Sequence, residues 1–477
     1  METLPAEVVE MIALFLSIKD LKACCGTTHT WRDIFGQDTI WKRHCNRALA
    51  KCLGAAQSRV EPKFVLSEEE HLKNLSPLGE WRQAYLQEQL LWSHWRNGNY
   101  VMEELTIKSS YKCKRMKVKE NMLCHFVTDH YLITLCKRKV MLWDVCNSPV
   151  IVSKPFELLL TGDVNFCSTF GNDKIIIVQQ TLVQIYHHGS PMELTWSLEQ
   201  SFFFDREDPV PFNKTDKTVT SPLNSRCVVD ENLFVGILLS GEVHIWNLTS
   251  GKKLKTVLYP GSDNVNNCIV KVVHSEKPPK DFIIVAKWFF TYNFYVFSMT
   301  SLDFYYVQNS ETLELTLPSC AIQHGLLAVG TTKSSKVFNY RTSQRLLKVL
   351  PTIGKFTIGL VAMGDYFLLV EEEKIHLFHT ITTTYECVIH IPVVVSYSHR
   401  ISACFNTICD KFLIIKYSLP DFDSLDNPAL EIYLKTNPIK IIRRRNFNFC
   451  HIFAMNSVSS KLAVQSSNGN VCIVSFW

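Results

Sequence analysis

Glycine is scarce in this chain, and the motifs of common catalytic sites are missing. Only 18 of the 477 residues are glycine, a low number for loops that cradle phosphate groups. The sequence contains no Walker-type loop, GxSxG elbow or HExxH motif, which argues against the enzyme classes that depend on them. The pair His187-His188 ends an expected strand, where its side chains diverge, and such surface pairs are commoner than metal sites. We expect a non-enzymatic protein with no cofactor and no metal ion.

Long apolar runs and a disulfide framework are also missing. The nearest candidate for a membrane span, Phe282 to Phe297, contains Lys287 and falls short of the ~18 uninterrupted apolar residues that a span needs. The 17 cysteines follow no framework of spacings, so we expect reduced thiols. Glu2, Glu7 and Glu10 stand where a signal peptide would have basic and apolar residues. These observations predict a cytoplasmic and/or nuclear protein with no membrane partner.

The chain also has little excess charge of either sign. Its formal net charge is +5 over 477 residues, too little to indicate a general affinity for nucleic acid. Arg443 to Arg445 form the only compact basic run along the sequence, and we expect a solvated turn there. Apolar residues make up 47% of the chain and aromatic residues 12%, which predicts a well-buried protein with more than one domain.

The first 16 residues carry a regular apolar ridge. Its members are Leu4, Val8, Ile12 and Leu16, with Val9, Met11 and Phe15 widening it. This period predicts an amphipathic helix from Pro5 to Leu16, with Pro5 in the first turn. A unit of roughly 45 residues is at or below the size at which a lone core suffices. The ridge therefore indicates a protein partner.

Three further helices are expected after this ridge, followed by a helical linker over residues 48–98. Asp20 is the expected N-cap of the second helix, Thr27 or Thr28 caps a third that carries Trp31, and Trp41 lies on a fourth. In the linker, Ser67 to Glu70 has capping-box spacing and Pro77 suits the start of another helix. The aromatic residues that share one face of that helix are Trp81, Tyr85, Trp92 and Trp95. We expect this face to pack on the following domain and to form a stiff spacer.

The N-terminal unit resembles an F-box, the motif that docks a protein onto the Skp adaptor of a cullin-based ubiquitin ligase. The residues that carry the resemblance are Leu4 to Val8, Ile12, Leu16, Asp20-Leu21, Trp31 and Ile40 to Lys42. It implies an F-box over residues 1–47 whose adaptor-binding residues are Leu4, Pro5, Val8, Ile12, Leu16 and Trp31. Cys24-Cys25-Gly26 departs from the bulkier aliphatic residues of the family, which would weaken adaptor binding. The alternative is an ordinary helical cap on a larger domain.

From about Tyr100 onward, short β-rich runs replace the helical pattern. Eight hairpins are expected, in which the first strand of each pairs with the second: Tyr131 to Cys136 with Val140 to Val145, Lys174 to Gln179 with Leu182 to His187, Leu233 to Leu238 with Glu242 to Leu248, Phe282 to Lys287 with Asn293 to Ser298, Leu326 to Thr331 with Ser335 to Tyr340, Tyr366 to Val370 with Lys374 to His379, Phe412 to Tyr417 with Leu430 to Leu434, and Lys461 to Gln465 with Asn470 to Ser475. A period near 40 residues with four strands per unit is typical of a WD-type β-propeller, although only Trp143-Asp144 is a literal WD pair. We expect an all-β propeller over residues 99–477, with eight blades, or seven if one hairpin belongs to its neighbour. Val101 to Ile107 is the expected outer strand of the last blade.

The expected strand before each hairpin tends to contain a cysteine. These cysteines are Cys124, Cys167, Cys227, Cys268, Cys320, Cys404 and Cys450. An innermost strand near a central channel has little room, and cysteine acts there as a small hydrophobic residue. The alternative roles, metal ligand or nucleophile, need paired spacing or a nearby ligand set that these cysteines lack.

Three long insertions fall on the propeller face that carries the connections between blades. They are Asp205 to Pro222, Tyr259 to Asn267 and Ser418 to Ala429, and they hold eight acidic residues, Asp205, Glu207, Asp208, Asp216, Asp263, Asp421, Asp423 and Asp426, against Arg206, Lys214 and Lys217. Our hypothesis is a substrate face that prefers a basic or neutral segment, because phosphate recognition calls for clustered arginines. The alternative is solvated loops without function. In a nearby turn, Trp288 is either packed in its loop or a contact anchor on this face.

Over nearly its whole length, the chain resembles the F-box/WD-repeat family. The resemblance implies a substrate-recognition subunit that binds the Skp adaptor and, through it, cullin and RING subunits, and that presents an unidentified protein substrate. Such a subunit acts through proximity and makes no bonds itself. The alternative is a WD-repeat scaffold whose F-box-like head docks outside any ligase. Neither alternative involves nucleic acid.

Overall fold

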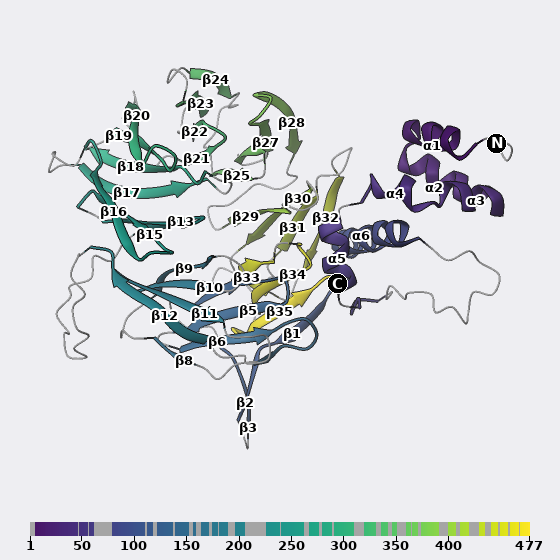
Figure 1. Ribbon diagram of the computed structural model, residues 1–477, viewed down its shortest axis with the longest axis horizontal. Coiled ribbons are helices and arrows are strands. Elements are labelled where there is room, and N and C mark those ends of the chain that lie inside the picture. The colour runs from purple at the N-terminus through teal and green to yellow at the C-terminus, as the bar shows by residue number, and fades with distance from the viewer. Residues whose placement is uncertain are drawn as a thin grey trace.

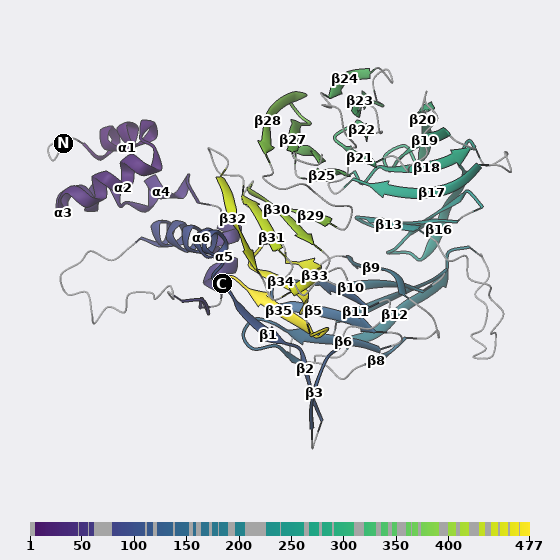
Figure 2. The same cartoon turned by 180° about the vertical axis from the view of Figure 1, so that it is seen from behind.

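The computed structural model places helices at one end of the molecule and a ring of sheets at the other (Figures 1 and 2). No helix in the described part of the chain is both long and apolar enough to cross a membrane. The residues described are 5–45, 47–55, 57–61, 79–109, 112–117, 122–136, 139–151, 156–158, 164–170, 174–179, 181–188, 196–205, 226–238, 240–261, 267–275, 279–288, 291–309, 319–330, 335–341, 346–350, 359–363, 365–370, 374–390, 399–406, 411–418, 429–434, 440–446, 449–456, 458–466 and 468–477.

Six helices precede the first strand in the described residues. Their bounds are α1 Ala6–Phe15, α2 Ile18–Thr27, α3 His29–Phe35, α4 Asp38–Lys42, α5 Arg47–Gly54 and α6 Glu80–Asn97. The four helices of the N-terminal unit were predicted from the sequence, whereas α5 was not. The expected capping box at Ser67 and the expected start at Pro77 lie outside the described residues, and α6 begins after Gly79.

Eight antiparallel sheets of four or five strands form the ring in the described residues. In six of them the strands are hydrogen-bonded in chain order, and the first sheet differs only in that its fourth and fifth strands both pair with its third. The strands of the first four of these sheets are β4 Leu123–Phe126, β5 Tyr131–Cys136, β6 Lys139–Asp144, β7 Val150–Ile151 and β8 Phe156–Glu157; β9 Val164–Phe170, β10 Lys174–Gln179, β11 Leu182–His188 and β12 Trp196–Phe203; β13 Arg226–Asp230, β14 Leu233–Ile237, β15 Glu242–Asn247 and β16 Lys252–Leu258; and β17 Asn267–His274, β18 Phe282–Trp288, β19 Thr291–Ser298 and β20 Asp303–Asn309. The next three sheets comprise β21 Ser319–Gln323, β22 Leu326–Gly330, β23 Ser335–Asn339 and β24 Leu346–Leu350; β25 Gly359–Met363, β26 Tyr366–Val370, β27 Lys374–His379 and β28 Thr384–His390; and β29 His399–Asn406, β30 Lys411–Ser418, β31 Ala429–Leu434 and β32 Lys440–Asn446.

The eighth sheet closes the ring with strands from both ends of the β-rich region. It contains β33 Phe449–Met455, β34 Lys461–Ser466, β35 Val471–Ser475 and, as its outer strand, β1 Val101–Glu104. The register pairs Val101 with Ser475 and Glu104 with Cys472. The expectation that the start of the β-rich region completes the last blade is therefore confirmed, and pairing β35 on its outer side leaves that strand without a free edge.

All eight expected hairpins are present, each as the second and third strands of its sheet. The chain is therefore an eight-bladed propeller, as the repeat period predicted, and no hairpin is absorbed by a neighbour. One expectation was wrong: Arg443 to Arg445 lie in strand β32 and do not form a turn.

The core of the ring is divided into clusters that each fill the space between adjacent sheets. The cluster with Ile133, Leu142, Ile175 and Ile177 joins the first two sheets, for example. Cys167 packs against this cluster and Cys124 against the one between the closing and first sheets, while Cys227 and Cys320 are members of two further clusters. In these sheets the inner-strand cysteine lies between its own blade and the preceding one. The structure therefore gives these four cysteines the packing role expected of small hydrophobic residues.

Candidate functional site

Helix α1 buries one face within the N-terminal unit and leaves another uncovered. Pro5 occupies the N-cap position, and its carbonyl oxygen accepts hydrogen bonds from the amides of Val8 and Val9. Val9 and Ala13 are buried in the core of the unit. The uncovered apolar side chains lie on the same helix, with exposed fractions of 55% for Met11, 64% for Leu14 and 89% for Phe15. Such exposure of large apolar side chains on one helix is typical of surfaces that bind another protein.

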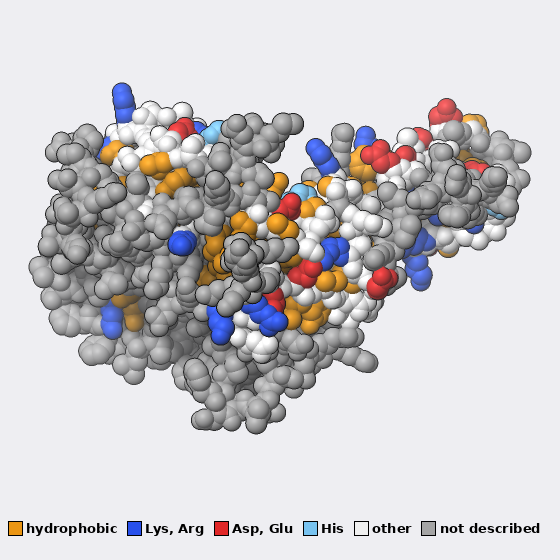
Figure 3. Space-filling model, turned by 90° about the horizontal axis from the view of Figure 1, so that it is seen from below, with side chains coloured by type: hydrophobic (Ala, Val, Ile, Leu, Met, Phe, Trp, Pro, Cys, Tyr) orange, Lys and Arg blue, Asp and Glu red, His pale blue; other side chains and the backbone are white. Residues whose placement is uncertain are grey.

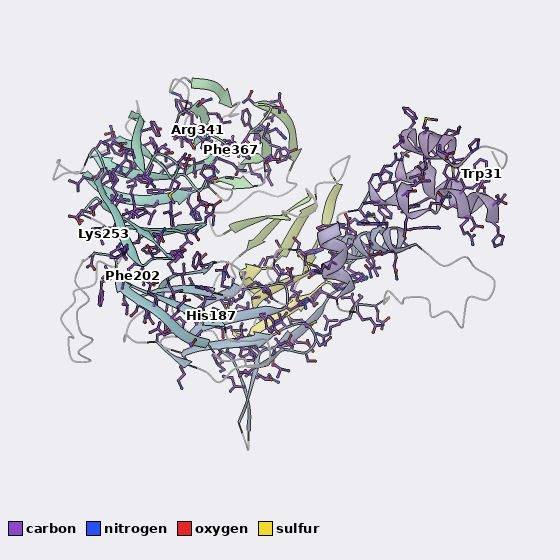
Figure 4. The ribbon with its side chains drawn as sticks, in the orientation of Figure 1. Trp31, His187, Phe202, Lys253, Arg341 and Phe367 are labelled. Atoms are coloured by element: carbon purple, nitrogen blue, oxygen red, sulfur yellow. The ribbon has the colours of Figure 1, made fainter. Side chains whose placement is uncertain are left out.

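The predicted adaptor-binding residues flank this surface. Val8, Ile12 and Leu16 are half-buried, Pro5 is exposed, and Leu4 lies outside the described residues. Trp31 on α3 is half-buried against Phe35, with ring centroids 5.7 Å apart, at the end of the molecule away from the sheets (Figure 4). Leu14 was not predicted as a site residue, because it falls outside the four-residue period of the ridge. The structure thus places Val8 and Ile12 between the buried and exposed faces of α1.

The caps of the next two helices set the residues at which α2 and α3 begin. The prediction that Asp20 is the N-cap of α2 was wrong, because the cap is Ser17. The Ser17 hydroxyl accepts from the Asp20 amide at 3.3 Å, and the Asp20 carboxylate accepts from the Ser17 amide at 3.2 Å. These two hydrogen bonds form a reciprocal capping box with Asp at N3 in place of the usual Glu or Gln. The pKa of Asp20 is lowered, first because the Ser17 hydroxyl also donates to its carboxylate at 2.6 Å and second because the Ser17 amide donates to it. Thr28 caps α3 as one of the two expected residues, with its hydroxyl accepting from the Trp31 amide at 3.1 Å.

The first half of α6 belongs to the N-terminal unit. Tyr85 packs on Trp41 with ring centroids 5.2 Å apart, and Lys22 lies 4.9 Å from the centre of the Tyr85 ring. The Asp38 carboxylate on α4 accepts hydrogen bonds from the amides of Glu80 and Trp81, at 3.1 and 3.0 Å. Asp38 thereby satisfies amides that are free at the start of a helix. The N-terminal unit therefore cannot turn freely relative to α6.

The second half of α6 belongs to the ring of sheets. The Trp95 indole donates a hydrogen bond to the Ser459 carbonyl oxygen at 2.7 Å. His94 Nδ1 lies 2.8 Å from the carbonyl oxygen of Phe476, so Nδ1 carries the proton, because a carbonyl can only accept. Trp477 donates its indole proton to the Leu53 carbonyl oxygen of α5 at 2.9 Å. The predicted aromatic face of α6 is thus shared between two units, although the sequence analysis assigned it to the propeller alone.

These contacts define two faces of the ring. Ser459 and Phe476 lie where β33 connects to β34 and where β35 ends, so α5 and α6, which we call the stalk, dock on that side. A segment after α5 also lies on the ring: Arg59 pairs with Glu103 of β1 at 2.5 Å and donates to the Asn147 carbonyl oxygen of the first sheet at 2.6 Å. The stalk is therefore fixed across the seam where the ring closes. The opposite face, which we call the insertion face, carries the connections between the sheets.

The predicted substrate-face residues fall on the insertion face wherever the structure describes them. Asp205 follows β12 directly and is half-buried. Trp288 ends β18 and is paired in register with Thr291, but its side chain lies outside the described residues. Asp208, Asp263, Asp421 and Asp423 are also outside them, as are the other charged residues of the three insertions. Of the six predicted substrate-face residues, the structure therefore places Asp205 and Trp288 on the insertion face, and it does so through the positions of their strands.

The part of the chain that the structure describes contains no cluster of three or more His, Cys, Asp or Glu residues able to hold a metal ion. Burial raises the pKa of the Cys124 and Cys167 thiols to about 12 and that of Cys320 to about 11. Such thiols are almost entirely protonated at neutral pH and are poor nucleophiles. These three inner-strand cysteines are structural.

Comparisons with known proteins agree with the N-terminal architecture. Residues 1–47 match the family described as F-box-like, so the chain begins with an F-box-like domain. No curated protein matches the sequence. Among solved structures, the computationally designed Ika8 protein has a TM-score of 0.48 at 9% identity, covering 76% of this chain and 98% of that one. BamB from Moraxella catarrhalis has a TM-score of 0.46 at 10% identity, covering 79% and 100%. The C-terminal WD40 domain of Sif2 has the same score and identity, covering 78% and 99%.

Proposed function

We propose that this protein is the substrate-recognition subunit of a Skp–cullin–F-box ubiquitin ligase, with similarity to the subgroup of F-box and WD-40 domain-containing protein 12. The F-box-like domain binds the Skp adaptor and, through it, cullin and RING subunits, and the insertion face of the propeller binds a protein substrate. We propose the domain division expected from the sequence, with the F-box-like domain over residues 1–47, a helical linker over 48–98 and the propeller over 99–477.

The uncovered apolar surface of α1 is the observation that supports this proposal most directly. Met11, Leu14 and Phe15 remain exposed although the same helix buries Val9 and Ala13. Covering such side chains against a partner stabilises a complex by roughly 1.5–3 kcal/mol for each fully buried residue. Together with the half-buried Val8 and Ile12, they form a continuous apolar strip on α1.

The rigid stalk supports the same proposal. Tyr85 ties α6 to the F-box-like domain, while Trp95 ties it to the closing sheet. The insertion face points away from the docking side of the stalk, so a substrate there would not compete with the stalk for space. A fixed geometry between adaptor and substrate raises the effective concentration of substrate lysines near the charged enzyme.

Co-purification of the full chain with the Skp adaptor and cullin tests the proposal. We expect the wild-type chain to recover both partners and Met11→Glu/Phe15→Glu to lose them, because burying two carboxylates in an apolar contact is unfavourable. Ile381→Glu is the matched control, since this apolar residue of the propeller is 61% exposed, and it should recover both partners. If the wild-type chain recovers neither, under conditions where a known F-box protein recovers both, the protein is a propeller scaffold outside any ligase.

A further inference from the structure

A small hairpin projects from the insertion face at the seam of the ring. It consists of β2 Thr106–Ser109 and β3 Lys112–Arg115, which pair only with each other in the described part of the chain. The hairpin lies within the connection from β1 to β4. Figures 1 and 2 both show it extending beyond the sheets, away from the helices.

The base of this hairpin is anchored in the closing sheet. Leu105 and Met116 are buried in the cluster that fills the seam between the closing and first sheets. The Leu105 amide donates to the Val471 carbonyl oxygen at 2.9 Å, and the Val471 amide donates to that of Met116 at 2.8 Å. The Asn470 side chain also donates to the Glu104 carboxylate at 2.9 Å. These contacts hold the projection in a fixed direction.

The hairpin is strongly basic. Residues 105–117 contain no Asp or Glu, and their basic residues are Lys108, Lys112, Lys114, Arg115 and Lys117. Five positive charges on thirteen residues equal the formal excess of +5 of the entire chain. Arg115 pairs with Glu104 at 2.8 Å but stays 64% exposed, and the exposed Lys117 has no ion pair with any residue that the structure describes. Figure 3 looks onto the side from which the hairpin projects, where described Lys and Arg side chains lie among hydrophobic and acidic ones.

We propose that this hairpin binds an extended polypeptide segment rich in Asp and Glu by adding it as a third strand. Both strands have an outer edge that is unpaired in the described residues, and an open edge offers backbone groups to an incoming strand. Lysines on such an edge oppose pairing with neutral strands or with a second copy, but they attract a strand that carries carboxylates. A strand of four residues spans about 13 Å, so the bound segment is short. That this segment belongs to a ubiquitylation substrate rests on the proposed function, whereas the binding itself does not.

The composition of the hairpin selects this partner over two other anionic ones. Nucleic acid needs a basic surface that follows its backbone over several nucleotides, but each strand of this hairpin is only four residues long. Phosphorylated segments favour clustered arginines, whose planar fork matches a phosphate. Here four of the five cations are lysines, and the single arginine is paired with Glu104. Lysine ammonium groups are separate point charges. Carboxylate side chains at alternate positions of a strand can pair with them one by one, so they suit this hairpin better than a phosphate group does.

Fluorescence anisotropy with the full chain and a labelled peptide of eight alternating Glu and Val residues tests the proposal. We expect saturable binding that Lys108→Thr/Lys112→Thr/Lys114→Thr weakens about ten-fold, because three charge pairs with the peptide are lost. Threonine preserves strand propensity. The matched control, Lys252→Thr/Lys253→Thr/Lys255→Thr, removes the same charge from the exposed strand β16 and should bind the peptide like the wild type.

Four results would overturn the proposal: no binding to the wild-type chain, an equal loss in the β16 control, tighter binding of a phosphoserine version of the peptide, or tighter binding of an oligonucleotide. A peptide with a central proline should bind more weakly, because proline cannot complete the strand ladder, and equal binding would exclude strand addition. The hairpin variant should still co-purify with the Skp adaptor, so failure of this proposal is distinct from failure of the proposed function.

Discussion

Trp95 of α6 stacks on Phe476 beyond the last strand, with ring centroids 3.5 Å apart and ring planes within 14° of parallel. The Trp95 indole also donates to the Ser459 carbonyl oxygen. One side chain therefore joins the stalk both to the end of β35 and to the turn before β34. This buried pair is one of the contacts that set the orientation of the F-box-like domain relative to the propeller.

Truncation of Trp95 should loosen the stalk and destabilise the closing sheet. We expect Trp95→Ala to lower stability by about 3–5 kcal/mol, the usual effect of removing a large buried aromatic side chain. Thermal unfolding of the full chain and limited proteolysis of α6 would measure it. Trp95→Phe is the control, because it keeps a stacked ring and loses the indole hydrogen bond, so its effect should be clearly smaller. Equal effects of the two variants would show that the stacking contributes nothing.

The propeller could be predicted from the sequence because its signal is local and repeated. The expected strands Tyr366 to Val370 and Lys374 to His379 have the same bounds as β26 and β27. Each such pair combines an apolar strand with a short turn, and eight repeats of one pattern reduce the effect of a single weak strand. The closure of the ring by β1 could be predicted from the same repeat of four strands, since no segment after the last hairpin could supply its outer strand.

The features that the sequence did not reveal are of two kinds. Some are contacts between residues that lie far apart in the chain, and others are positions where neighbouring residues could play the same role. Both Ser17 and Asp20 can cap a helix, and only the geometry shows that Ser17 does so. Tyr85 and Trp95 share the periodicity of one helix, but their partners lie in two separate units. The lysines of the β2–β3 hairpin are interleaved with other residues and divided between two strands, so no compact run indicated them.

The inner-strand cysteines should resist alkylation in the folded protein. Burial raises the pKa of Cys124 and Cys167 to about 12, so the thiolate fraction at pH 8 is on the order of 10⁻⁴. We expect little labelling by iodoacetamide at pH 8 and complete labelling in denaturant, measured by mass spectrometry of the peptides. Rapid labelling of either cysteine in the folded chain would contradict the packing role and would indicate an accessible thiol.

Two glycines should respond in opposite directions to the same substitution. A Cβ at Gly236 would lie 2.4 Å from the Phe204 ring, whereas a Cβ at Gly26 would meet nothing within 4 Å. We expect Gly236→Ala to destabilise the third sheet by about 1–3 kcal/mol through overpacking. Gly26→Ala should stabilise α2 by about 0.5–1 kcal/mol, because alanine favours the helix.

Thermal unfolding of both glycine variants would measure these effects. Gly236→Ala combined with Phe204→Leu serves as the control, since a smaller side chain at position 204 should recover part of the lost stability. A loss in the double variant as large as the sum of the two single losses would exclude the predicted clash.

Lys461 should make the stability of the folded protein depend on pH in the alkaline range. Its buried ammonium donates to the carbonyl oxygens of Val145 and Cys146 in the first sheet, and burial lowers its pKa from the usual 10.5. At pH values between the lowered pKa and 10.5, the unfolded chain therefore binds more protons at this lysine than the folded chain does. The contribution of Lys461 to stability thus rises with pH across that window.

The wild type should gain stability relative to Lys461→Met as the pH is raised from 7 to 10, measured as the difference in Tm between the two proteins. Leu462→Ala is the control, because this buried neighbour does not titrate and its difference from the wild type should stay constant. A difference between wild type and Lys461→Met that is flat or reversed over the same range would show that the lysine is not held in a desolvated site at the seam.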